Sequence, residues 1–430
     1  MMQSKTSRSK IMSCNNAMLL VVNLFALTIW SQSITKRVLF LGNSYTNTNN
    51  LPLLVANIAQ STNDVLLYDS YTPGGYRLSD HANNTTSLAK IAQGNWDYVV
   101  LQEQSQLPSF PINQVNSLVF PFAANLNTLI NSQNPCAETV FYMTWGRQNG
   151  DSQNCAAHPP VCTYSGMDDL LRERYQIMAE QQSAITAPVG AVWRYLRTNY
   201  PDMNLYSADG SHPSLLGSYA AACTFYTTLF RKDPTLISFQ STLTAVEAQT
   251  IKNVVKTVVF DQRSTWFIGT YDPVAAFSFS NPTGTAVQFE NQSQNSSDYL
   301  WDFGDGTTAT TANPLHTYAQ NGVFTVTLTV THCGVASVVQ QLVDTSVLAI
   351  TTAGASSAVV KMFPNPVQSL LHIESIAGVK EIEIYDASGR SILKSSENTK
   401  SIDCSNLEPA MYWLKITTTA ATHYQKFIKS

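Results

Sequence analysis

Two short segments of the sequence carry the residue types that nucleophilic catalysis requires. In the first, residues 37–46, Ser44 comes directly after an apolar run. In the second, residues 206–214, Asp209 and His212 lie three positions apart. A serine hydroxyl becomes a nucleophile when a histidine removes its proton, and a carboxylate must orient that histidine. Together the two segments predict a Ser/His/Asp hydrolytic site.

Each segment also has an ordinary structural interpretation. The residues Asn-Ser-Tyr-Thr at 43–46 are common in turns and at helix starts. Asp209 could cap the helix expected after Pro213, with His212 at the surface. Under the catalytic interpretation, Gly210 instead permits the tight turn that brings the carboxylate to the imidazole. The presence of both segments in one chain favours the catalytic interpretation.

The elements that must position these residues alternate between strand and helix patterns. Strands are expected at 38–41, 65–70, 98–102 and 139–145, and helices at 51–61, 84–93, 115–132, 167–185, 213–230 and 243–258. Strands separated by helices pair in parallel with right-handed crossovers. Functional residues of such sheets gather beyond the carboxyl ends of the strands, where Ser44 would lie. The pattern predicts an α/β domain.

Four blocks in this region resemble the SGNH, or GDSL-like, hydrolases. In order they are GNSYT (42–46), TPGGYRLSDH (72–81), DYVVLQEQS (97–105) and DGSHPS (209–214). The resemblance covers about residues 36–258 and implies a flavodoxin-like, three-layer domain at 34–262, with no metal or organic cofactor. It implies that Ser44 attacks an ester carbonyl, that His212 transfers the proton, and that Asp209 holds the imidazole.

The same resemblance implies an oxyanion hole that includes the backbone N–H groups of Ser44 and Gly75. The middle residue of the family's Gly-Asp-Ser is Asn43 here, which keeps the nucleophile. The family's Gly-x-Asn-Asp is absent, and Gln102 and Gln104 occupy its neighbourhood. A glutamine amide can donate a hydrogen bond to an oxyanion as asparagine does. Gln102 is expected to be the third donor because it is nearer the strand end, with Gln104 as the alternative.

Three other residues near these blocks are expected to have structural roles. His81 and Arg77 should fix the loop after the second strand, and Trp145 should belong to the core, because lone polar residues and aromatics usually serve packing.

After residue 265 the pattern changes to short alternating strands. The segments 299–306, 314–318 and 322–326 resemble a PKD domain, which implies an immunoglobulin-like sandwich at 270–348. A spacer and a polysaccharide-binding module are both open interpretations of it.

A small-residue linker at 351–358 precedes a last β module at 356–430. The segments 362–366, 382–390 and 407–416 resemble the type A sorting domain of the type IX secretion pathway. This resemblance implies a second small sandwich, the type IX secretion machinery as partner, and removal of the domain. The protein would finish outside the cell or on its surface.

The N-terminus is expected to be an export signal over residues 1–33. Basic residues at positions 5, 8 and 10 precede an apolar run at 17–30, and the retained-anchor alternative is disfavoured because a span needs about 20 apolar residues. No later segment could span a bilayer. The net charge of −4, without a later basic run, gives no sign of a nucleic-acid partner.

Six cysteines remain after the expected signal: Cys136, Cys155, Cys162, Cys223, Cys333 and Cys404. An exported chain meets an oxidising compartment, so a local disulfide is predicted between Cys155 and Cys162. A zinc site that adds His158 is the alternative, but it lacks a fourth ligand. The pairing of the other cysteines is open.

These features predict a secreted serine esterase, with O-acetyl groups on glycans as the expected substrate. A lipid esterase or an acyltransferase using the same three residues is an alternative. So is a surface-binding protein whose hydrolase-like domain has lost turnover, because the third block is altered.

Overall fold

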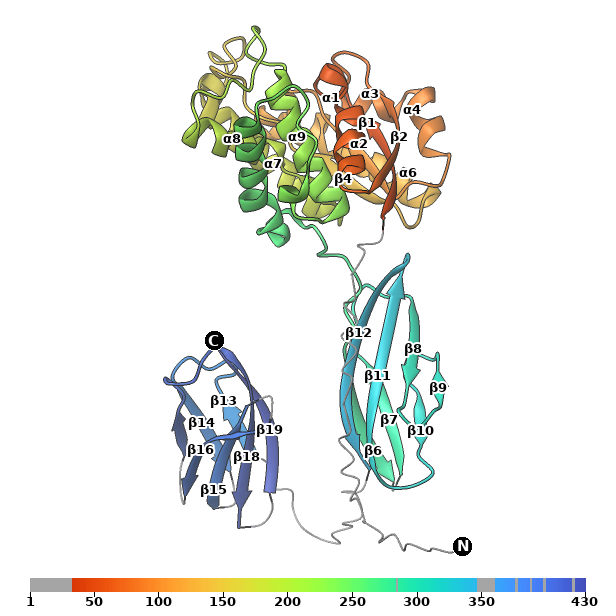
Figure 1. Ribbon diagram of the computed structural model, residues 1–430, viewed down its shortest axis with the longest axis vertical. Coiled ribbons are helices and arrows are strands. Elements are labelled where there is room, and N and C mark those ends of the chain that lie inside the picture. Colours follow the sequence, from red (N-terminus) through yellow and green to blue (C-terminus); the bar gives the residue numbers. More distant parts are fainter. Residues whose placement is uncertain are drawn as a thin grey trace, which may run out of the picture. The chain divides into compact units, whose positions relative to one another are not determined.

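A computed structural model describes residues 33–283, 285–345, 360–375, 378–386, 389–396, 400–419 and 422–430 (Figure 1). The linker at 351–358 and all but the last residue of the expected export signal lie outside these ranges. Within the ranges, no helix is both long and apolar enough to cross a membrane.

The first domain is built on a five-stranded parallel sheet. Its strands are β1 (Thr35–Leu41), β2 (Val65–Tyr71), β3 (Tyr98–Leu101), β4 (Glu138–Tyr142) and β5 (Ile185–Ala187), in the order β2-β1-β3-β4-β5. The central strands are buried on both faces, so their sequences are continuous apolar runs such as Val-Leu-Phe-Leu at 38–41. The carboxyl ends of β1 and β3 lie side by side, since Leu41 pairs with Leu101.

Helices cover the sheet in two groups (Figure 1). They are α1 (Ser44–Asn47), α2 (Leu51–Ser61), α3 (Leu78–Ala82), α4 (Thr85–Ile91), α5 (Ile112–Leu118), α6 (Phe120–Gln133), α7 (Tyr164–Gln181), α8 (Val189–Asn199), α9 (Leu215–Phe230) and α10 (Ala245–Val255). Helix α9 packs against α2, α8 and α10, while α6 packs against α3, α4 and α7. Two helical layers around one sheet confirm the predicted three-layer α/β class.

The element boundaries differ from the expected ones at a few places. The helix expected at 115–132 is two helices that meet at Val119, because Pro121 follows at once and proline is tolerated only in a first helical turn. Strand β5 and helix α8 were not predicted. Strand β5 has only three residues, which is too short for any periodic pattern.

Two antiparallel β domains follow the α/β domain. The first contains β6 (Phe277–Thr283), β7 (Ala286–Asn291), β8 (Asp298–Asp302), β9 (Thr308–Ala309), β10 (Leu315–Thr317), β11 (Val323–His332) and β12 (Val335–Asp344), in sheets β10-β7-β6 and β12-β11-β8-β9. The rings of Phe277, Phe289 and Trp301 contact one another in its core.

The last domain contains β13 (Val360–Phe363), β14 (Leu370–Ser375), β15 (Val379–Tyr385), β16 (Ser391–Ser396), β17 (Ser401–Asp403), β18 (Ala410–Thr418) and β19 (Thr422–Lys429). Its sheets are β13-β14-β17 and β16-β15-β18-β19. Ile382, Leu414 and Phe427 are fully buried in its core. Both β domains agree with the sandwiches expected from sequence.

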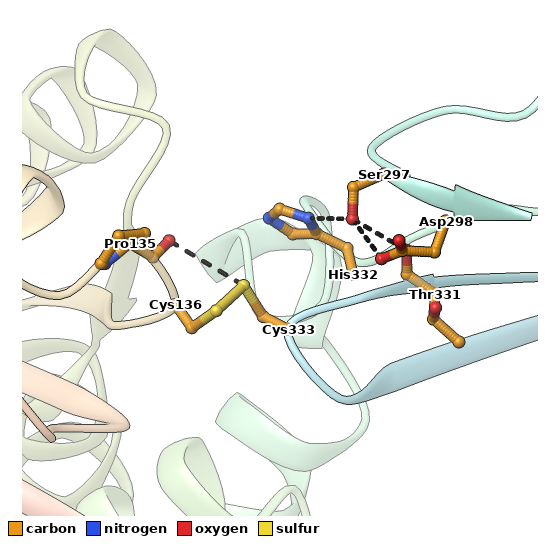
Figure 2. Close-up of a disulfide and its surroundings, with 7 residues drawn as sticks. All are labelled: Pro135, Cys136, Ser297, Asp298, Thr331, His332 and Cys333. Carbon is orange, nitrogen blue, oxygen red and sulfur yellow. Dashed lines mark hydrogen bonds between the residues drawn. A yellow bond between two sulfur atoms is a disulfide. The ribbon is translucent and has the colours of Figure 1, made fainter.

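Two disulfides are present among the residues that the structure describes. The predicted bond between Cys155 and Cys162 is confirmed, and it uses both sulfurs that the zinc alternative needs. The second bond joins Cys136, which precedes β4, to Cys333 (Figure 2). Cys333 lies in the two-residue turn between β11 and β12, at a φ of +50°. Such turns favour Asn-Gly, so Cys333 occupies a position that asparagine takes more often.

We expect the Cys136 bond to stabilise the protein more than the local one does. Cross-linking lowers the entropy of the unfolded chain, and the effect grows with the loop that is closed. The Cys136–Cys333 bond spans 197 positions and the Cys155–Cys162 bond spans 7, which corresponds to about 5 and about 2 kcal/mol. Replacing both Cys136 and Cys333 by serine should therefore lower the thermal midpoint more than replacing Cys155 and Cys162. An equal loss, or free thiols at Cys136 and Cys333 in the unreduced protein, would contradict this.

Candidate active site

Ser44 lies at the end of a tight turn between β1 and α1. Gly42 and Asn43 form the turn, and Ser44 is the first residue of the helix. The Asn43 side chain accepts a hydrogen bond from the Tyr45 amide at 3.1 Å. A side chain at Gly42 is excluded, because its Cβ would lie 2.5 Å from Thr46 Oγ1. The Ser44 amide has no acceptor within the helix, since first-turn amides never do.

A continuous chain of hydrogen bonds links Ser44, His212 and Asp209. His212 Nε2 lies 2.8 Å from Ser44 Oγ, and His212 Nδ1 lies 2.5 Å from Asp209 Oδ2. An ionised carboxylate can only accept, so Nδ1 carries the proton and Nε2 accepts from the serine hydroxyl. The side chains of His212 and Asp209 are 37% and 49% exposed, so a substrate from solution can reach them. The structure brings together the three residues chosen from sequence.

Hydrogen-bond donors surround the Asp209 carboxylate. Slight burial acts to raise the pKa of Asp209, but hydrogen bonds from the His212 ring and from the amides of Ser211 and His212 outweigh it and lower that pKa. Asp209 Oδ1 accepts both amides at 3.0 Å, while Oδ2 faces the ring. One oxygen therefore shapes the loop and the other holds the His212 ring.

The loop at 206–213 rests on buried aromatic side chains. Trp145 Nε1 donates to the Ser211 carbonyl at 3.0 Å, and the Tyr45 hydroxyl shares a 2.6 Å hydrogen bond with Ser211 Oγ. The rings of Tyr45 and Trp145 are stacked. Trp145 is fully buried, in agreement with its expected packing role. Gly210 has a φ of +66°, which glycine adopts without strain.

The Gln102 side chain is hydrogen-bonded to the turn at 42–44, which joins β1 to α1. It is fully buried, and its Oε1 accepts from the Asn43 amide and from Thr46 Oγ1, both at 2.9 Å. Its Nε2 donates to Asn43 Oδ1 at 2.9 Å and to the Glu103 carbonyl at 2.6 Å. Both amide hydrogens are occupied, so none is left for an oxyanion. The expected role of Gln102 as the third donor is therefore revised to that of holding the turn.

Gln104 is the other glutamine of this block, and its side chain is partly exposed. Its Oε1 accepts from the amides of Gln106 and Leu107 at 2.8 and 3.1 Å, which fixes the amide plane. Its Nε2 contacts Gln106 Oε1 at 3.2 Å and Ser105 Oγ at 3.4 Å. The contact with Gln106 lies at the upper end of the usual N–H···O range and the contact with Ser105 lies beyond it, so one of the two amide hydrogens is weakly engaged. Ser105 itself interacts with the Tyr45 hydroxyl beside the histidine loop.

Two further buried ionisable groups lie in the segments that follow β2 and β3. His81 Nε2 lies 2.9 Å from the Gly42 carbonyl, and Nδ1 lies 2.8 Å from Ser87 Oγ. Burial lowers the pKa of His81, although the contact with Gly42 opposes the shift, so the ring stays neutral and structural as expected. Burial also raises the pKa of Glu103 to about 8, with amide donors from Gln104 and from α3 opposing it. Glu103 is therefore mostly protonated at neutral pH.

The loop that contains Gly75 is hydrogen-bonded to the turn at 42–44. Asn43 Nδ2 donates to the Tyr76 carbonyl at 2.9 Å. Gly75 has a φ of +73° and is exposed. Arg77 precedes α3, where its amide donates to Asp80 Oδ2 at 2.9 Å, and the expected role of its side chain in the loop stays a prediction.

The two glutamines should respond differently to substitution by alanine. Gln104→Ala should lower kcat by about 100- to 1000-fold, the effect of losing one oxyanion donor, with little change in thermal midpoint. Gln102→Ala should lower the thermal midpoint as well, because it leaves buried partners unsatisfied. Steady-state kinetics and thermal melts on both variants check this. Normal turnover in Gln104→Ala would mean that backbone amides alone form the oxyanion hole.

Comparison with known families identifies all three domains. Residues 24–261 match a domain of unknown function, DUF4886. Residues 271–347 match the PKD domain, and residues 361–430 match the secretion system C-terminal sorting domain. The PKD and sorting domains predicted from sequence are thus confirmed. The sorting domain indicates secretion or a place on the cell surface.

Individual proteins of known structure or function are also similar to parts of the chain. A DUF4886 family protein from Bacteroides uniformis ATCC 8492 is 16% identical, covers 52% of this chain and 94% of its own, and has a TM-score of 0.46. A protein from Slackia heliotrinireducens described as an SGNH hydrolase is 28% identical, with coverages of 46% and 100% and a TM-score of 0.39. Collagenase ColA of Bacillus cereus is 44% identical over 57 residues, which are 12% of this chain and only 6% of the collagenase.

Proposed function

The chain belongs to the DUF4886 family, and we propose that its α/β domain is a secreted serine esterase with Ser44 as nucleophile. The observation that carries this proposal is the hydrogen-bonded chain from Ser44 Oγ through His212 to Asp209. Neither the family description nor the titles of the two solved structures described above name a substrate. The proposal therefore depends on the geometry of the site.

In the first half of the reaction, Ser44 Oγ attacks the carbonyl carbon of the ester. His212 Nε2 takes the hydroxyl proton, and the Asp209 carboxylate stabilises the imidazolium that forms. The carbonyl oxygen gains negative charge and accepts hydrogen bonds from the Ser44 and Gly75 amides and from Gln104 Nε2. His212 then gives its proton to the leaving alcohol as the carbon–oxygen bond breaks.

In the second half, a water molecule replaces the alcohol. His212 removes a proton from the water, whose oxygen attacks the acyl group on Ser44. The tetrahedral intermediate collapses, the acid leaves, and the proton on His212 returns to Ser44 Oγ. The cycle consumes one ester and one water, and it returns Ser44, His212 and Asp209 to their starting protonation states.

We propose O-acetyl groups on glycans as the substrate. The sorting domain indicates that the protein meets its substrate outside the cell or on its surface. The exposure of His212 and Asp209 supports access for an ester group carried on a large polymer.

A substrate panel tests this proposal on the exported protein. We expect acetate release from acetylated polysaccharides and hydrolysis of p-nitrophenyl acetate. Hydrolysis of lysolipids without acetate release would favour a lipid esterase instead. Inactivity on every ester, together with polysaccharide binding, would favour the surface-binding alternative.

A further inference from the structure

A cavity of about 320 Å³ borders the loop that carries the catalytic base. Its lining includes Gln148, Arg197, Met203, Asn204 and Tyr206. This volume is at the lower end of the roughly 300 to 1,000 Å³ that small-molecule sites occupy. It suits one small group rather than a whole polymer.

The cavity and the base loop share part of their structure. The Gln148 amide donates to the Gly210 carbonyl at 2.8 Å, and Gly210 directly follows Asp209. A Cβ atom at Gly210 would lie only 3.3 Å from Gln148 Oε1. Tyr206 begins the same loop and pairs with Pro213 in an isolated bridge. Two of the lining residues, Gln148 and Tyr206, therefore contact the loop that carries Asp209 and His212.

Arg197 gives the cavity a positive charge. In the part of the chain that the structure describes, no carboxylate forms an ion pair with Arg197, whereas Arg194 on the same helix is paired with both Asp168 and Asp169. The only other ionisable lining group is the Tyr206 phenol. Burial raises the pKa of Tyr206, so that phenol stays neutral.

The Arg197 guanidinium is held in place yet keeps free donors. It lies over the ring of Tyr164 at 4.0 Å and near that of Tyr206 at 5.1 Å. Its Nη2 donates to the Gln148 carbonyl at 3.1 Å, whereas the Tyr206 hydroxyl donates to the Gly146 carbonyl at 2.6 Å. A guanidinium has five N–H donors in a planar fork that matches a carboxylate. The N–H groups that do not donate to Gln148 are the ones that a carboxylate could engage.

Arg197 could also have a purely structural role. It lies in the last turn of α8, where a cation interacts favourably with the helix dipole. The structural role does not explain why Arg197 borders a cavity or why its guanidinium lies against the rings of Tyr164 and Tyr206. A second cavity, of about 390 Å³, also contains an arginine, but the charge of that arginine is compensated. Its Arg231 is neutralised by Glu138 and Asp272.

We propose that the Arg197 cavity is a subsite for a carboxylate of the substrate, so that the hydrolysed ester is carried on an acidic sugar. This inference rests on the proposed esterase function and names its substrate class. Arg197 is then a specificity-determining residue, and a uronic acid with an O-acetyl group is the kind of ligand that would fit.

A matched pair of substrates tests the subsite on the exported protein. One is an O-acetylated uronic-acid oligosaccharide, and the other is the same oligosaccharide with its carboxyl groups reduced to alcohols. We expect a kcat/KM at least about tenfold higher for the acidic form, since a hydrogen bond to a charged group is worth that much. Arg197→Gln should remove this preference, mainly through KM, and Arg197→Lys should keep part of it.

Arg172→Gln is the matched control, because Arg172 also lies over an aromatic ring, that of Trp266, and does not line the cavity. It should keep the preference. An equal acidic-to-neutral ratio in Arg197→Gln and the unchanged protein would overturn the subsite. Hydrolysis of p-nitrophenyl acetate separates the two proposals: if it is present, only the subsite has failed, and if the unchanged protein hydrolyses no ester, the esterase proposal itself has failed.

Discussion

Replacing Ser44 by alanine should lower kcat about a million-fold and leave the thermal midpoint nearly unchanged. Removing a serine nucleophile has an effect of that size because the acyl-enzyme cannot form. The Ser44 hydroxyl contacts His212 Nε2, and its loss opens no cavity in the core. Such a substitution should change the free energy of unfolding by no more than about 0.5 kcal/mol. Hydrolysis of p-nitrophenyl acetate and a thermal melt measure the two quantities.

Thr244→Ala provides the opposite pattern as a control. The Thr244 hydroxyl caps α10, where it accepts from the Glu247 amide at 3.2 Å. Losing a cap costs about 1 kcal/mol of stability, and kcat should not change. Substantial turnover in Ser44→Ala would show that another residue is the nucleophile.

Asp209→Asn should lower kcat about 10,000-fold, the effect of placing the histidine in the wrong tautomer. The asparagine oxygen can still accept the amides of Ser211 and His212, so the loop should keep its shape. Its amide group, however, would donate to His212 Nδ1. The proton would then move to Nε2, which could no longer accept the proton of Ser44.

The chain contains a second Asp–His pair that serves as a control. Asp305 Oδ2 lies 2.8 Å from His316 Nε2 in the first β domain. Asp305→Asn makes the same chemical change there and should leave hydrolysis unaffected. Full activity in Asp209→Asn would move the orienting role to another carboxylate.

The sequence predicted the parts of the site that follow from local pattern. Buried parallel strands are continuous apolar runs, so the position of Ser44 after β1 could be inferred. The spacing of Asp209 and His212 within one loop was equally local. Their approach to Ser44, 168 positions from His212, could be expected because functional residues gather at the carboxyl edge of such a sheet.

The remaining features depend on contacts between distant segments. Whether Gln102 points to solvent or folds back onto Asn43 is decided by the packing of β1 against β3, which alternation along one strand cannot show. The Cys136–Cys333 bond spans 197 positions. The left-handed conformation of Cys333 is a local sign of this bond, but that conformation can be seen only in the structure.

Labelling by a fluorophosphonate, followed by peptide mapping, tests the central claim most directly. The reagent reacts with a serine hydroxyl whose proton a neighbouring base removes. We predict one adduct per molecule, located on Ser44, and its loss in His212→Ala. An adduct on a different residue, or ester hydrolysis that continues without labelling of Ser44, would contradict the account.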